Sequence, residues 1–141
     1  MTYFPWDPSL ETGDELIDEQ HRSLFALADS LQVALEERRP EADAVANAIY
    51  GLTDYVVEHL ADEEAMMARA GYPGLSSHHS MHEHLSEETL RLAARYFNGD
   101  DVAPDTLAPF VTSWLQDHIR KQDMLFVAYA KATRQAGGAP R

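Results

Sequence analysis

Residues 49–70 read IYGLTDYVVEHLADEEAMMARA. Apolar side chains recur in this stretch at steps of three and four residues, the spacing that lines one face of an α-helix. Two polar residues interrupt the series, which consists of Ile49, Leu52, Val56, His59, Glu63, Met66 and Ala70. His59 and Glu63 thus stand where the pattern otherwise has apolar side chains, and we expect both to be buried.

Three other segments show the same kind of interruption. His21 lies between Ile17 and Leu24 in the first of them. The second series consists of His78, His82, Leu85, Thr89, Leu92 and Tyr96. The third consists of Val111, Leu115, His118, Gln122 and Leu125. Each segment therefore predicts a helix whose apolar face carries at least one side chain able to bind a metal.

Turn-forming residues separate these segments. Asp18 is the expected N-cap of the first helix, which we expect to end near Arg38. The glycine and proline at Gly71 and Pro73 end the second helix, and Pro104 begins the fourth. No stretch alternates with a period of two residues over the length of a strand, so we predict no sheet.

These boundaries predict an all-α fold, an up-down-up-down antiparallel four-helix bundle with an extended N-terminal arm. We expect the arm at residues 1–16, packed on the bundle, and the bundle itself at residues 17–135. Residues 136–141 contain two glycines and a proline, and we expect them to fray.

Composition limits the chemistry that such a bundle can perform. The chain has 24 acidic and 11 basic residues, a net charge of −13, which disfavours nucleic acid and anionic membranes as partners. It has no cysteine, so a metal would have to bind nitrogen and oxygen ligands. It has neither a signal peptide pattern nor an apolar run long enough for membrane insertion, and we expect a cytoplasmic protein.

If these residues are buried, their polar groups need partners, because each unpaired buried polar group costs about 1–3 kcal/mol of folding free energy. One buried histidine is more often a hydrogen-bonded core residue than a ligand. Five histidines and a glutamate on four apolar faces are better explained by a shared metal cluster. Asp123 lies about 140° from His118 on an ideal helix, so we expect it to reach the cluster from the edge. His79 and His84 should face solvent.

The motifs, taken in order, resemble those of the hemerythrin family in its single-domain bacterial type. The resemblance covers residues 6–129 and rests on Asp18-Glu-Gln-His21, His59-x-x-x-Glu63, Ala70-Gly-Tyr72, His78-x-x-x-His82, Trp114-Leu-x-x-His118 and Asp123. It implies two iron ions, bridged by an oxo or hydroxo group and by the carboxylates of Glu63 and Asp123. One iron would be held by His78, His82 and His118, and the other by His21 and His59.

The same resemblance implies reversible binding of dioxygen, for transport, storage or delivery to a recipient protein, rather than enzymatic turnover. Together with the two bridging carboxylates and the shared oxygen, the five histidines would leave one octahedral position open on the two-histidine iron, where dioxygen would bind. Leu115 matches the family's pocket leucine, and we expect Phe25, Leu24, Trp114 and Ile119 to line the pocket with it.

Two alternatives share the same ligands. The first is a di-iron enzyme, a peroxidase or a protein that handles nitric oxide. The second is an oxygen sensor that acts through a separate partner, since a chain of 141 residues leaves no room for a fused signalling domain.

Overall fold

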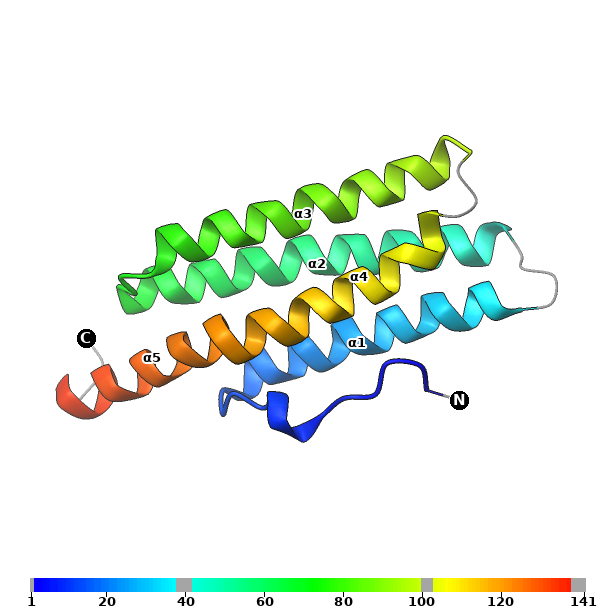
Figure 1. The fold of residues 1–141 in the computed structure, drawn as a ribbon. Helices are drawn as coiled ribbons and strands as arrows, with labels where there is room; N and C mark the ends of the chain where they lie inside the picture. The colour runs from blue at the N-terminus through cyan, green and yellow to red at the C-terminus, as the bar shows by residue number, and fades with distance from the viewer. Residues whose placement is uncertain (1, 38–41, 100–102, 138–141) are drawn as a thin grey trace.

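The computed structural model describes residues 2–37, 42–99 and 103–137 of the chain, and these contain helices and no β-strand. The long helices are α1 (Glu15–Glu36), α2 (Ala42–Ala70), α3 (Leu75–Phe97) and α4 (Ala103–His118). The last continues through the π-helical turn η2 (Ile119–Asp123) into α5 (Met124–Gly137), so α4, η2 and α5 together form the fourth rod of the bundle (Figure 1).

The four rods form an antiparallel bundle in which each helix runs opposite to the one before it. α1 contacts α2, α2 contacts α3, α3 contacts α4, and α4 returns to α1. The predicted all-α, up-down-up-down bundle is therefore confirmed. No helix among the described residues combines the length and the hydropathy needed to cross a membrane.

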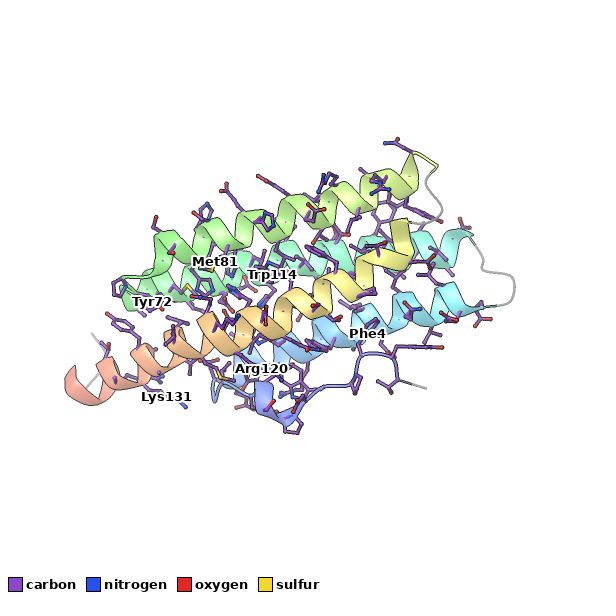
Figure 2. All side chains as sticks on the ribbon, in the orientation of Figure 1. Phe4, Tyr72, Met81, Trp114, Arg120 and Lys131 are labelled. Atoms are coloured by element: carbon purple, nitrogen blue, oxygen red, sulfur yellow. The ribbon has the colours of Figure 1, made fainter. Side chains whose placement is uncertain are left out.

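Residues 2–14 run along α1 as an arm that contains one short 3-10 helix, η1 (Pro8–Leu10). Leu10 is fully buried, and the ring of Trp6 meets Phe25 of α1 edge-on, with the centroids 5.3 Å apart. Arg120 points toward this side of the bundle (Figure 2) and donates a hydrogen bond to Asp7. The arm thus spans the outside of α1 and contacts the π-helical turn.

The N-cap of α1 is Asp14, and the prediction of Asp18 was wrong. The Asp14 side chain accepts a hydrogen bond from the backbone N–H of Ile17. Asp18 is buried one turn inside the helix, where its carboxylate accepts hydrogen bonds from the backbone N–H groups of Thr12 and Gly13. The apolar series begins at Ile17, so it gave no signal for the first helical residues.

The π-helical turn changes the register of the fourth rod. The N–H of Met124 bonds to the carbonyl of Ile119, five residues back, where an α-helix bonds four residues back. Residues five apart share a face in such a turn, so Asp123 lies on the same side as His118 and not at an edge. Beyond the turn the buried position moves by one residue: Phe126 is 3% exposed, whereas Leu125, which the pattern placed inside, is 59% exposed.

One position of the series predicted for α2 also differs in the structure. Near the end of α2 the fully buried methionine is Met67, whereas Met66, the one in the predicted series, is half-buried. The helix α5 continues through Gly137, two residues into the segment that was expected to fray. Residues 138–141 of that segment lie outside the described part of the chain.

A polar layer divides the interior of the bundle. The larger hydrophobic cluster extends from this layer toward the α1–α2 connection and includes Leu24, Phe25, Leu115 and Ile119. The smaller one lies at the other end and is formed by Ile17, Met67, Phe126 and Val127. The seven predicted metal ligands lie between the two clusters and form the polar layer.

Candidate metal centre

The structure brings all seven predicted ligands together in this layer. They come from every rod of the bundle: His21 from α1, His59 and Glu63 from α2, His78 and His82 from α3, His118 from α4 and Asp123 from η2. None of them is more than 5% exposed. The helical spacing of the pairs on α2 and α3 puts both members of each pair on the inward face.

Glu63 lies between two groups of histidines. Its Oε1 atom is 3.1 Å from Nε2 of His78 and 3.3 Å from Nε2 of His82. Its Oε2 atom is 3.6 Å from Nε2 of His21 and 3.5 Å from Nε2 of His59. One carboxylate therefore directs a separate oxygen at each group.

Asp123 repeats this arrangement from the opposite side of the bundle. Its Oδ1 atom is 2.9 Å from Nε2 of His78 and 3.0 Å from Nε2 of His118, and its Oδ2 atom is 3.1 Å from Nε2 of His21. The π-helical turn makes this possible, because it keeps Asp123 and His118 on one face. Both carboxylates thus have the position that a bridging ligand would take.

The distances among the histidines suit a common metal ion. Nε2 of His118 is 2.7 Å from Nε2 of His78 and 3.2 Å from Nε2 of His82. A metal–nitrogen bond of about 2.1 Å separates neighbouring ligands at right angles by about 3 Å. Two sets of ligand atoms meet closely enough to hold an ion: Glu63 with His78, His82, His118 and Asp123, and Glu63 with His21 and His59.

Several buried nitrogen and oxygen atoms of this layer have no hydrogen-bond partner. Among the described residues, both ring nitrogens of His21, Oε2 of Glu63 and both carboxylate oxygens of Asp123 are buried without a hydrogen bond. They lie near one another but are not aligned as donor and acceptor. Buried groups of this kind are costly unless a partner satisfies them, and nitrogen and oxygen ligands without sulfur suit iron, manganese or zinc.

The polar layer also shifts the pKa values of the residues that form it. Burial lowers the pKa of His21, but the carboxylates of Asp123 and Glu63 outweigh burial and raise it to about 9. The same balance raises the pKa of His78 to about 9. Burial prevails at His59 and lowers its pKa to about 4.

The two carboxyl groups shift in the opposite direction to the one that burial favours. Burial and the charge of Glu63 raise the pKa of Asp123, but its imidazole neighbours lower it to about 2. Burial also raises the pKa of Glu63, but the nearby imidazoles of His21 and His78 bring it well below its ordinary value. Both carboxylates are therefore ionised at neutral pH, as a bridging ligand must be.

Residues 12–130 match the family described as the Hemerythrin HHE cation binding domain. The chain belongs to the hemerythrin family. It is 32% identical to a bacteriohemerythrin of Stenotrophomonas maltophilia, over 94% of this chain and 84% of the relative. It is 28% identical to a myohemerythrin of Riftia pachyptila, over 87% of this chain and 90% of the relative.

Solved hemerythrin structures have the same fold. Wild-type hemerythrin superposes with a TM-score of 0.79 at 27% identity, over 91% of this chain and 98% of the other. A hemerythrin with a leucine-to-alanine substitution gives a TM-score of 0.80 at the same identity, over 92% of this chain and 98% of the other. The hemerythrin fold therefore accounts for nearly the whole chain.

Two residues that were not predicted hold histidines of the layer from outside. Nδ1 of His59 is 2.7 Å from Oε1 of Gln20, and Nδ1 of His82 is 3.0 Å from Oε2 of Glu64. Each lies next to a predicted ligand in the sequence, since Gln20 precedes His21 and Glu64 follows Glu63. That adjacency was the available signal, but it does not specify which histidine each residue contacts.

The two remaining histidines face outward, which confirms the prediction for both. His84 is exposed on α3. The His79 side chain is 54% exposed, but its Nδ1 contacts Oε1 of Glu64, so it also belongs to the surroundings of His82. His79 is thus a surface histidine with a defined partner.

The predicted pocket-lining residues fall into two places. Leu24, Phe25, Leu115 and Ile119 are at most 2% exposed and belong to the larger hydrophobic cluster. Trp114 is half-buried and stacks on the imidazole of His118, which places it beside the three-histidine group.

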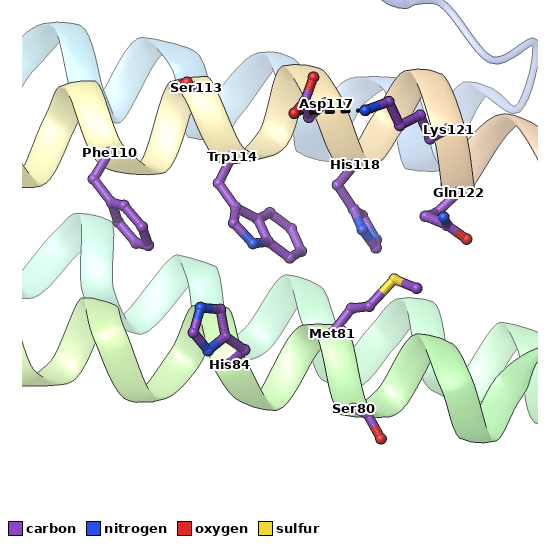
Figure 3. Close-up of a pocket in the computed structure, with 10 residues that line it drawn as sticks. All are labelled: Ser80, Met81, His84, Phe110, Ser113, Trp114, Asp117, His118, Lys121 and Gln122. Atoms are coloured by element: carbon purple, nitrogen blue, oxygen red, sulfur yellow. Dashed lines mark ion pairs between the residues drawn. The ribbon is translucent and has the colours of Figure 1, made fainter.

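Trp114 and His118 also line a surface groove of about 710 Å³ between α3 and the fourth rod. Phe110, Trp114 and His118 face Met81 and His84 across it (Figure 3). One edge of the candidate centre therefore lies close to the surface of the bundle.

Proposed function

We propose that this hemerythrin-family protein binds dioxygen reversibly at a non-haem di-iron centre. The observation that carries the proposal is the pair of carboxylates, Glu63 and Asp123, each of which directs one oxygen at a three-histidine group and the other at a two-histidine group. Two carboxylates between unequal sets of histidines suit a pair of metal ions that differ in their number of histidine ligands.

The contacts support the proposed ligand assignment. His78, His82 and His118 would hold one iron, and His21 and His59 the other, with an oxo or hydroxo group as a further bridge. With two histidines in place of three, the second iron would have a position free for dioxygen. A pair of ferrous ions would supply the two electrons that reversible dioxygen binding needs.

The protein contributes an apolar, water-poor environment. Leu24 and Phe25 lie about one turn beyond His21 on α1, and Leu115 lies about one turn before His118 on α4. These side chains are buried, and they carry no group that could donate or accept a proton. We therefore propose binding rather than turnover, because peroxide or nitric-oxide chemistry would require an acid–base group beside the open position.

One experiment tests the proposal directly. The purified protein is analysed for metal, and its visible spectrum is recorded with oxygen, after deoxygenation and after oxygen is restored. We expect two irons per chain and an absorption band that disappears and returns. Immediate irreversible oxidation, or rapid multiple-turnover consumption of peroxide, would show that the protein is not an oxygen carrier.

A further inference from the structure

One histidine in each group has a polar side chain against its outward-facing Nδ1 atom, and these two side chains differ in charge. Nδ1 of His82 faces the carboxylate of Glu64 at 3.0 Å. Nδ1 of His59 faces the amide oxygen of Gln20 at 2.7 Å. One ring of the three-histidine group therefore faces a carboxylate, and one ring of the two-histidine group faces a neutral amide.

Both contacts fix the same tautomer. In each ring Nε2 points into the polar layer, so Nδ1 carries the proton and donates it outward. A carboxylate accepts this hydrogen bond more strongly than an amide does, and it makes the opposite nitrogen a stronger electron donor to a metal. Nε2 of His82 should consequently be a better ligand than Nε2 of His59.

Glu64 is itself held in place. Its second oxygen, Oε1, contacts Nδ1 of His79, and only 22% of its side chain is exposed. The carboxylate is thus held between an outward-facing histidine and an inward-facing one. Gln20 is held similarly, because its Nε2 atom donates to Oδ2 of Asp62 at 3.1 Å.

We propose that Glu64 is a positioning residue that strengthens metal binding by His82, so that the three-histidine position fills before the two-histidine position. The inference rests on the ligand assignment of the proposed function, and it adds an order of loading and a residue responsible for it. His79 contributes by restraining the Glu64 carboxylate.

The test uses zinc, which occupies nitrogen and oxygen sites without redox change. Metal-free protein is titrated with Zn²⁺ against a chromophoric chelator, and ¹⁵N–¹H spectra of the histidine rings are recorded at each step. In the wild type, the first equivalent should shift the signals of His78, His82 and His118. The second equivalent should shift those of His21 and His59.

Glu64→Gln keeps the size of the side chain and one acceptor oxygen but removes the charge. We expect it to weaken the first zinc site 10- to 100-fold, as loss of an outer partner of a ligand does, and to move the Nδ1–H signal of His82. Asp62→Asn is the matched control for the first zinc site. It neutralises a carboxylate on the same helix, but this carboxylate contacts Gln20 on the two-histidine side, so the first site should keep its affinity. His79→Ala should give a smaller loss in the same direction as Glu64→Gln.

The outcomes separate the two proposals. A wild-type protein that fails to bind two zinc ions at these residues would overturn the ligand assignment itself. If two ions bind but the first goes to His21 and His59, or if Glu64→Gln binds the first ion as tightly as the wild type, only the role of Glu64 is wrong. Should Glu64→Gln not fold, as judged by the helicity of the metal-free protein, His79→Ala decides by the presence or absence of its smaller loss.

Discussion

The indole ring of Trp114 stacks on the imidazole of His118, with the ring centroids 4.3 Å apart and the planes inclined by 21°. Nε2 of the same imidazole lies 2.7 Å from Nε2 of His78, at the centre of the three-histidine group. The other tryptophan, Trp6, contacts Phe25. The chain therefore carries one tryptophan against a proposed ligand and one in its N-terminal arm.

This difference predicts how fluorescence responds to metal. Binding of iron at the three-histidine position should quench most of the emission from Trp114, because the indole is in contact with a ligand of the ion. Trp6→Phe should keep the metal-dependent quench, and Trp114→Phe should lose it. A full quench in Trp114→Phe would mean that the signal arises from Trp6.

Replacement of His118 by Ala should weaken metal binding at the three-histidine position by more than about 100-fold, a larger effect than the loss of an outer partner. His84→Ala is the control, because His84 lines the same groove but lies outside the polar layer. Metal analysis after gel filtration should show two ions per chain for His84→Ala and fewer for His118→Ala. Retention of two ions by His118→Ala would contradict the assignment.

The register change at the π-helical turn predicts a reversal in the cost of two adjacent substitutions. Phe126→Ala removes a side chain that is 3% exposed and should lower the free energy of unfolding by about 3–5 kcal/mol. Leu125→Ala removes one that is 59% exposed and should change it by less than about 0.5 kcal/mol. Denaturant unfolding of both variants measures the difference. A larger cost for Leu125→Ala than for Phe126→Ala would indicate a regular α-helix through residues 119–123.

The pKa values of His21 and His78, both about 9, predict that metal binding releases protons. Near pH 7 each ring is protonated in the metal-free protein, and a metal can bind only the neutral ring. Each ion displaces one of these protons, so the apparent affinity for each ion should rise about 10-fold per pH unit between pH 7 and 8. Calorimetric titration in buffers of different ionisation enthalpy counts the protons, and a count near zero would contradict the prediction.

The same values set the pH dependence of the metal-free fold. Because the pKa of His21 in the folded protein exceeds its ordinary value of 6.5, protonation of this ring stabilises the fold fully below about pH 6.5. This contribution is lost as the pH rises through 9. Chemical denaturation of metal-free protein should therefore show a lower free energy of unfolding at pH 9.5 than at pH 7, with His21→Gln showing a smaller difference.

Much of the fold and of the centre could be predicted because the ligands interrupt apolar series. His59 and Glu63 have the same three- and four-residue spacing as the apolar residues around them, so the pattern that predicts the helix also predicts which way they face. The outward direction of His79 and His84 followed from the same geometry. Periodicity of this kind depends on local sequence and a regular backbone.

The errors occurred where the backbone is irregular or the contact is long-range. The π-helical turn contains one extra residue, which places Asp123 on the ligand face and makes Phe126 the buried residue in place of Leu125. No local sequence pattern predicts such an insertion. The contact of Glu64 with His82 joins two helices, and its partner depends on how α2 and α3 are rotated against each other. Asp14 was missed as the N-cap because the first turn of α1 lies outside the apolar series.

The division of the interior by a polar layer has a consequence for how a metal could enter a finished bundle. The smaller cluster, formed by Ile17, Met67, Phe126 and Val127, has less apolar area to expose than the cluster on the other side of the layer. Local opening at that end therefore costs less free energy than opening at the other end. Ions would reach the ligands through transient separation of the helix ends near Tyr72, while the larger cluster keeps the four rods in register.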